Sequence, residues 1–319
     1  MRKTKAIAAT SALFLGAALA AAIPAAANAS AQPAITASPA VNGYLSAVSA
    51  SSSRDAWAVG SQTNGTAPSL AEHWNGRTWT RVTVPSLRGQ YSGLGSVTDI
   101  SPSDAWATGQ LYDSAQILHW NGKAWSRVPI PSIGSHSLST ISAASASDIW
   151  AVGSGASLHW NGKTWTRIPS PAPPYAKYGA FLNGVTAVSA DNIWAVGCTD
   201  GCQVQGAFSP QIEQWNGKTW KQAAAPVTPY GIYTLNSVAA ASASDAWAVG
   251  GGGPGTALSG AIAHWNGRTW KLSPGISGTQ FSGVTALSPG NAWAVGVAES
   301  GATGHALILH WNGKTWTRS

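Results

Sequence analysis

The sequence predicts an all-β fold, a six-bladed β-propeller of four-stranded antiparallel blades. Three observations lead to this fold class. The 319 residues include 36 glycines and 18 prolines, residues that break helix interiors. Only 9% of the residues are charged while 18 are tryptophan, which excludes a disordered polar chain. A sequence unit also recurs six times, at intervals of 44 to 53 residues, which is the period expected for propeller blades.

Two motifs define the repeat. The first is D-A-W-A-V-G or a close variant, and its tryptophans are Trp57, Trp106, Trp150, Trp194, Trp247 and Trp293. The second is W-N-G-[KR]-x-W, which supplies two tryptophans per copy, so that all 18 tryptophans belong to the repeat. The copies span about 44–86, 93–132, 137–171, 181–226, 234–275 and 280–319.

Each copy contains two hairpins. In the first, the distance from Val48 to Trp57 and between their equivalents is always nine residues, and turn residues of the pattern S-x-x-[DN] lie between them. The second hairpin contains Asn-Gly, the strongest short hairpin signal, and we expect a two-residue turn that places Trp74 opposite Arg77. Two hairpins give the four strands of one blade.

A single small sheet of this kind cannot cover both of its own faces, so neighbouring blades must pack against each other. An open solenoid would need atypical capping repeats at its ends, and the first and last copies here are ordinary. The sequence therefore favours a closed ring of six blades over an open stack.

The hairpin signature resembles that of kelch and Asp-box repeat propellers of the secreted bacterial type. W-N-G-K-T-W followed by T-R-I-P-S-P, from Trp160 to Pro171, is similar to the outer hairpin of such blades, and A-W-A-V-G to their second strand. The resemblance covers about residues 44–319. It implies a propeller fold that hosts enzymes as well as binding modules.

The N-terminal sequence predicts an export signal at residues 1–29. Arg2, Lys3 and Lys5 precede an apolar stretch, and Ala27-Asn28-Ala29 forms a small-residue cleavage site. A membrane anchor is the rival interpretation. We expect a secreted, extracellular protein that begins with a flexible lead-in over residues 30–43, a segment that could instead add a strand that latches the ring.

Charge and cysteine content restrict the partners. The formal net charge is +7, and removal of the leader leaves 15 basic against 11 acidic residues. This balance gives little reason to expect nucleic acid as a partner.

Cys198 and Cys202 are four residues apart and predict a loop disulfide, with a free pair or a metal site as alternatives. Five of the seven histidines occupy the same position in five different blades, and Gln214 replaces histidine in the fourth, so we expect no metal cluster. No cofactor is expected.

The candidate binding residues lie in or beside the connections of variable length, which share the face of the ring opposite the fixed turns. Tyrosine offers a flat apolar ring with a hydroxyl, suited to a sugar ring or a protein partner. These candidates are Tyr91, Tyr112, Tyr175, Tyr178, Tyr230, Tyr233, Arg88, Lys177 and Asp113. The alternative is that the tyrosines merely seal the ends of the blades.

Asp99 is a further candidate because the other five copies have alanine at its position. It is expected near the innermost strand, where it either lines the channel or is simply hydrated.

The sequence favours a secreted, non-catalytic and monomeric binding module that recognises a glycan or a surface protein through its Tyr-rich loop face. An enzyme that acts on carbohydrate, a glycosidase or a lyase, is the alternative, as is a structural cell-envelope protein. A sialidase-like site needs an arginine cluster, but only Arg54, Arg88 and Lys177 lie outside the repeated basic positions of the mature chain. The chain also contains no G-x-S-x-G motif.

Overall fold

The computed structural model describes residues 42–63, 69–85, 92–112, 114–134, 137–171, 180–199, 210–226, 234–252, 259–273, 276–300 and 303–319. The predicted leader lies outside these ranges, as does the lead-in except for its last two residues. The described residues contain 25 strands.

The strands form six antiparallel sheets, one for each sequence repeat. Blade one consists of β1 (Gly43–Ser52), β2 (Asp55–Gln62), β3 (Ser69–Trp74) and β4 (Trp79–Arg81), and blade two of β5 (Ser92–Ser101), β6 (Asp104–Leu111), β7 (Ser114–Trp120) and β8 (Trp125–Val128). Blade three consists of β9 (Leu138–Ser145), β10 (Asp148–Gly153), β11 (Ala156–Trp160) and β12 (Trp165–Arg167).

The second half of the chain repeats this arrangement. Blade four consists of β13 (Ala180–Ser189), β14 (Asn192–Thr199), β15 (Pro210–Trp215) and β16 (Trp220–Gln222). Blade five consists of β17 (Thr234–Ser242), β18 (Asp245–Gly252), β19 (Ser259–Trp265) and β20 (Trp270–Leu272), with the short β21 (Ile276–Ser277) also paired to β19. Blade six consists of β22 (Thr279–Ser288), β23 (Asn291–Ser300), β24 (Thr303–Trp311) and β25 (Trp316–Arg318).

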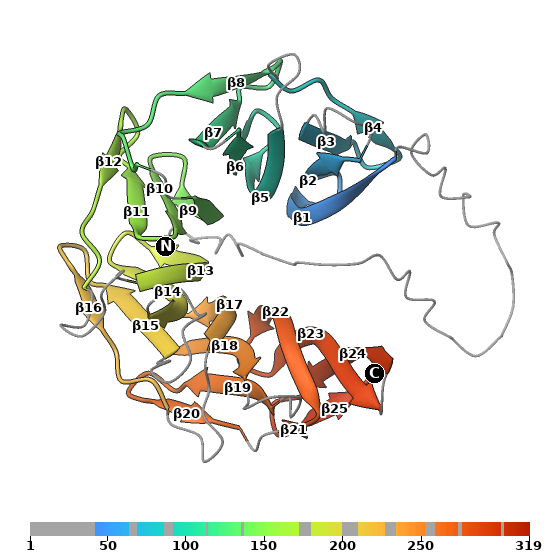
Figure 1. Ribbon diagram of the computed structural model, residues 1–319, viewed down its shortest axis with the longest axis vertical. Helices are drawn as coiled ribbons and strands as arrows, with labels where there is room; N and C mark the ends of the chain where they lie inside the picture. Colours follow the sequence, from blue (N-terminus) through green and yellow to red (C-terminus); the bar gives the residue numbers. More distant parts are fainter. Residues whose placement is uncertain are drawn as a thin grey trace, which may run out of the picture.

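Within every blade the strands follow one another in chain order. The first strand of each blade lies nearest the centre of the ring and the fourth at its outer edge (Figure 1). The predicted six-bladed propeller with four-stranded antiparallel blades is therefore confirmed. The sequence left open which strand is innermost, and the structure answers that it is the first.

The innermost strand of every blade contains a β-bulge at the same place. In β1, Leu45 pairs with Gly60 and Ala47 pairs with Val59, so that Ser46 has no partner on β2. The bulge brings the chain so close that a Cβ on Gly60 would lie 2.0 Å from the carbonyl oxygen of Tyr44. This contact explains why the second-strand motif ends in glycine in all six copies.

Tryptophans fill the seams between consecutive blades. Trp57 of blade one packs against Trp120 and Trp125 of blade two, with ring centroids 4.9 and 4.8 Å apart. The same three-ring arrangement joins blades two to three, three to four, four to five and five to six: Trp106 with Trp160 and Trp165, Trp150 with Trp215 and Trp220, Trp194 with Trp265 and Trp270, and Trp247 with Trp311 and Trp316.

The ring is open between blade six and blade one, which differs from the closed ring expected from the sequence. Leu45 and Val48, on the free face of blade one, are 44% and 37% exposed, whereas their equivalents Leu94 and Val97 in blade two are 2% exposed. Figure 1 shows the blue first blade and the red sixth blade apart. Each packed seam sets the rotation from one blade to the next. The five rotations together do not bring blade six into contact with blade one.

The second hairpin also differs from its prediction. Trp74 pairs with Trp79 rather than facing Arg77, so the turn has four residues instead of two. The Asn75 side-chain oxygen accepts hydrogen bonds from the backbone N–H groups of Arg77 (2.9 Å) and Thr78 (3.0 Å), and Gly76 has a φ of 88°. The asparagine side chain thus stabilises a longer loop, which the Asn-Gly signal did not distinguish.

Candidate functional site

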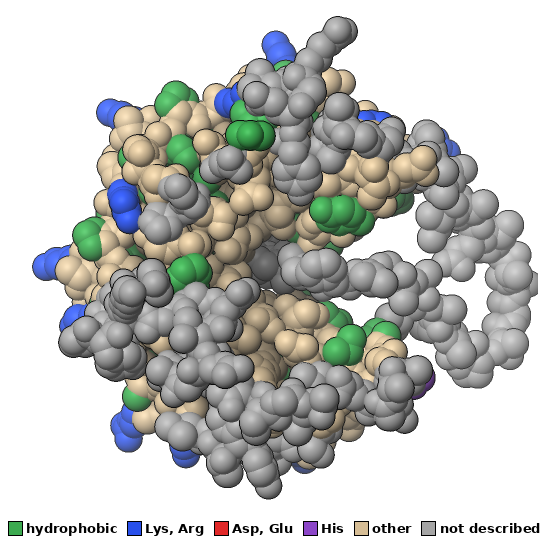
Figure 2. All heavy atoms as spheres, in the orientation of Figure 1, with side chains coloured by type: hydrophobic (Ala, Val, Ile, Leu, Met, Phe, Trp, Pro, Cys, Tyr) green, Lys and Arg blue, Asp and Glu red, His purple; other side chains and the backbone are tan. Residues whose placement is uncertain are grey.

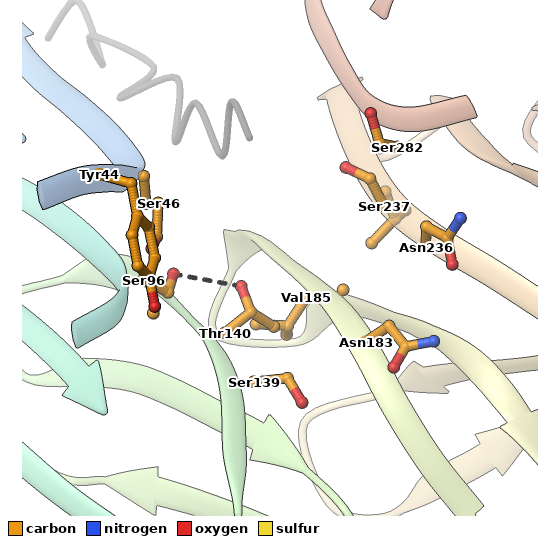
Figure 3. Close-up of a pocket in the computed structure, with 14 residues that line it drawn as sticks. Tyr44, Ser46, Ser96, Ser139, Thr140, Asn183, Val185, Asn236, Ser237 and Ser282 are labelled. Carbon is orange, nitrogen blue, oxygen red and sulfur yellow. Dashed lines mark hydrogen bonds between the residues drawn. The ribbon is translucent and has the colours of Figure 1, made fainter. Parts of the chain in front are cut away.

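The candidate site is a cavity of about 570 Å³ at the centre of the ring (Figure 3). All six innermost strands line it. Each contributes the residue at its β-bulge, namely Ser46, Gly95, Ser139, Asn183, Asn236 and Ser282. A bulge turns a side chain away from the regular alternation of the strand. The same local irregularity thus builds the cavity wall six times.

Hydrogen bonds to the following blade fix the two asparagines. The Nδ2 group of Asn183 donates to the Thr234 hydroxyl and to the carbonyl oxygen of Leu235, both at 3.1 Å. The Nδ2 group of Asn236 donates to the carbonyl oxygen of Phe281 at 2.7 Å. No described residue bonds the Oδ1 atom of Asn183, which leaves an oriented acceptor at the cavity.

The lining carries no charged side chain. It combines serine and threonine hydroxyls with two amides, groups that both donate and accept hydrogen bonds. Tyr44 is its one aromatic residue and is 49% exposed. Chemically, this surface suits neutral polar groups such as peptide bonds or sugar hydroxyls, and it offers nothing to neutralise an ion.

The repeated aspartates and histidines lie outside the lining of this cavity, and in four blades they pair with each other. His73 stacks on Trp57, with ring centroids 4.5 Å apart, and its Nε2 atom lies 2.7 Å from Asp55 Oδ1. Equivalent histidine–aspartate pairs occur in blades two, three and five: His119 with Asp104, His159 with Asp148, and His264 with Asp245. Within the described ranges, no group of three or more His, Cys, Asp or Glu residues could hold a metal ion.

Several solved structures resemble this fold, whereas no family model and no curated protein matches the chain. YCF48 bound to D1 peptide aligns with a TM-score of 0.57 at 18% identity, over 87% of this chain and 81% of that one. YCF48 from Cyanidioschyzon merolae gives 0.58 at 17%, over 88% and 86%. The extracellular domain of a hybrid two-component system from B. thetaiotaomicron gives 0.54 at 14%, over 88% of this chain but only 36% of that one.

The chain is a β-propeller. At these identities the likeness establishes the fold alone. The described part of the propeller has no helix with the length and apolar character needed to cross a bilayer.

Asp99 lies neither in the channel lining nor in water. It is 3% exposed, in the seam between blades one and two. Its Oδ2 atom accepts a hydrogen bond from the Ser51 N–H at 2.9 Å, and its own N–H donates to the Ser49 hydroxyl at 3.0 Å. Burial and, second, the neighbouring Asp55 carboxylate raise the pKa of Asp99 to about 7. The structure therefore gives this residue a place in a blade interface.

Most loop candidates lie outside the described residues: Arg88, Tyr91, Asp113, Tyr175, Lys177, Tyr178, Tyr230 and Tyr233. Tyr112 is described, in the turn between β6 and β7, where it is 63% exposed and has a φ of 56°. Cys198 is fully buried and disulfide-bonded, while Cys202 falls outside the described ranges.

The cavity residues themselves were missed by sequence reasoning. A signal for them exists, since each repeat reads Leu or Phe, two residues, then Val or Ile, and the first of the two is polar in five copies and glycine in one. A regular strand would place this residue opposite a partner on the second strand. Only the bulge directs it to the channel, and a bulge cannot be read from the alternation of residues.

Proposed function

We propose that the propeller is a non-catalytic binding module whose central cavity holds an extended segment of a partner protein. The observation that carries this proposal is the repeated use of one bulge, which places a neutral hydrogen-bonding side chain in a single cavity from five of the six blades. An extended polypeptide presents N–H and C=O groups along its length, and these need both donors and acceptors. The cavity volume lies in the range of binding pockets for small ligands, about 300–1,000 Å³.

The comparisons support a protein partner for a propeller of this shape. One of the similar structures is that of YCF48 bound to D1 peptide. At 18% identity this similarity supports a shared fold. Peptide binding by the present chain is our proposal.

A glycan is the second candidate, and two exposed tyrosines favour it. Tyr44 at the cavity and Tyr112 on a connecting turn are 49% and 63% exposed. Exposed aromatic rings suit stacking against sugar rings. The candidate tyrosines on the variable connections would extend this surface.

We further propose that the protein is exported, and that its repeats are of the kelch or Asp-box kind. The composition of residues 1–29 supports export, and the hairpin signature around Trp160 supports the repeat type. N-terminal sequencing of the protein secreted by its host would test export, with Ser30 as the expected first residue.

Binding is tested with the mature protein on a peptide array and a glycan array. For any ligand found, Ser139→Tyr should weaken binding at least tenfold because the new ring occupies the cavity. Ser103→Tyr is the matched control, since Ser103 is exposed in the turn between β5 and β6 and far from the cavity. A ligand whose affinity is unaffected by Ser139→Tyr would refute the cavity as the site, and loss of a glycan with Tyr112→Ala would favour the loop face instead.

A further inference from the structure

The turns of the two hairpins in each blade meet on one face of the ring. In blade one, the Trp74 indole N–H donates to the carbonyl oxygen of Ser53 at 3.1 Å, which fastens the second hairpin to the turn between β1 and β2. Four other blades have the same bond: Trp120 to Pro102, Trp215 to Ala190, Trp265 to Ala243 and Trp311 to Pro289. The paired turns therefore form a rigid face, here called the turn face.

Each of the six blades places one basic residue at the tip of its second hairpin on this face. These residues are Arg77, Lys123, Lys163, Lys218, Arg268 and Lys314, and all are exposed. Arg54, in the turn between β1 and β2, adds a seventh exposed cation. Because the blades are copies of one unit, each of the six basic residues occupies the equivalent position in its blade.

Most of the described acidic side chains are buried, so they compensate few of these charges at the surface. Six of them are buried, namely Asp55, Glu72, Asp99, Asp148, Glu213 and Asp245. Asp104 is half-buried beside His119. Asp191, in the turn between β13 and β14 on the turn face, is the one exposed acid among the described acidic side chains, and it opposes seven exposed cations there. In Figure 2 the visible Lys and Arg side chains lie along the outer edge of the ring, and no Asp or Glu side chain is visible.

We propose that the turn face docks on an anionic lipid surface. Cations at equivalent tips on one face of the ring can approach a flat surface together, whereas a linear polyanion would follow only part of the ring. Each basic residue near an anionic lipid surface strengthens binding about fivefold. The bulges lie near the start of the innermost strands, at the end away from the turn face, so docking would leave the central cavity open to the surroundings.

Vesicle sedimentation tests this proposal independently of any ligand of the cavity. The mature protein should bind vesicles of phosphatidylglycerol and phosphatidylcholine at low salt and leave vesicles of phosphatidylcholine alone. Binding should be lost in about 1 M salt, where the screening length falls to about 3 Å. Absence of binding to the anionic vesicles would overturn the proposal.

Two matched pairs of substitutions assign the binding to the turn face. Lys123→Gln with Lys163→Gln should weaken vesicle binding about 25-fold, from two contributions of about fivefold each. Arg127→Gln with Arg167→Gln removes the same charge from the outer strands of the same blades. Arg127 and Arg167 reach away from the turn face, to the carbonyl oxygens of Pro85 and Gly155, so this pair should retain most of the binding.

The outcomes separate the alternatives. Lys123→Arg with Lys163→Arg should restore binding because the charge returns. Equal losses for the two Gln pairs would mean that overall charge drives adsorption, and would overturn the assignment to the turn face. Binding to soluble heparin without binding to anionic vesicles would indicate a linear polyanion as the partner, and would equally overturn the proposal.

Discussion

The side chains of Asp55 and Asp99 lie carboxyl to carboxyl across the seam between blades one and two. Asp55 also accepts a hydrogen bond from the Ser51 hydroxyl at 2.5 Å and lies 2.7 Å from His73. Two neighbouring carboxylates favour protonation of one of them, and the raised pKa of Asp99, about 7 against an ordinary 3.8, reflects burial first and the Asp55 carboxylate second. The seam between blades one and two therefore contains a buried acid whose pKa lies near neutrality.

The first prediction concerns the pH dependence of stability. Because the pKa of Asp99 is higher in the folded than in the unfolded protein, its contribution is complete below about pH 4 and is lost as the pH rises through about 7. Asp99→Asn keeps an oxygen acceptor for Ser51 and cannot ionise. The melting temperature of this variant should therefore rise relative to that of the wild type as the pH increases from 5 to 8. Asp191→Asn, at an exposed site, is the control. A melting-temperature difference between Asp99→Asn and the wild type that stays constant from pH 5 to pH 8 would contradict the prediction.

A second buried acid, Glu213, should show the same pH dependence, without a neighbouring carboxylate among its causes. Glu213 is fully buried, accepts hydrogen bonds from Ser170 (2.5 Å) and Gln211 (2.9 Å), and has a pKa raised by burial to about 7. The sign is the same, so its ionisation penalises the folded state as the pH rises towards 8. Glu213→Gln should lose stability least, relative to wild type, at pH 8. Melting curves from pH 5 to pH 8 measure the stability of this variant relative to the wild type. A stability loss that grows towards pH 8 would refute the prediction.

The third prediction tests the open seam in solution. Val48 and Val97 are equivalent residues, but Val48 is 37% exposed and Val97 is 2% exposed. Val48→Asp should change the free energy of unfolding by no more than about 0.5 kcal/mol, as exposed substitutions usually do. Val97→Asp leaves an unpaired charge in a packed seam and should cost at least 3 kcal/mol. Equal costs in a monomeric protein would show that the ring closes in solution.

The fourth prediction tests the bulge that builds the cavity. A Cβ on Gly109 would lie 2.0 Å from the carbonyl oxygen of Gly93, whereas a Cβ on Gly95 would find its nearest neighbour, the Ser139 carbonyl oxygen, at 3.8 Å. Gly109→Ala should therefore cost more than about 2 kcal/mol of stability through backbone displacement. Gly95→Ala, in the cavity wall, should be close to neutral. Denaturant unfolding of both variants measures the difference, and similar values would argue against a tight bulge.

Local features of the sequence were sufficient for the blades. The spacing of Trp57 and Trp74 and of their copies defined the repeat, the S-x-x-[DN] and Asn-Gly turns separated its four strands, and the repeat count gave the number of blades. These inferences succeed because hairpins are made by residues close in sequence. The length of the second turn escaped them, since the same Asn-Gly pair serves in a two-residue turn and in a loop closed by the Asn75 side chain.

The sequence by itself thus determined the blade, its copies and the tryptophans that cover its faces. Only the tertiary structure decided that Ser46 and Asn183 share one cavity, that Asp99 faces Asp55, and that Val48 stays uncovered. Each of these facts depends on the rotation between neighbouring blades, which arises from how whole side chains fit across a seam. Residues about 45 positions apart meet there, and no local pattern in the chain encodes that angle.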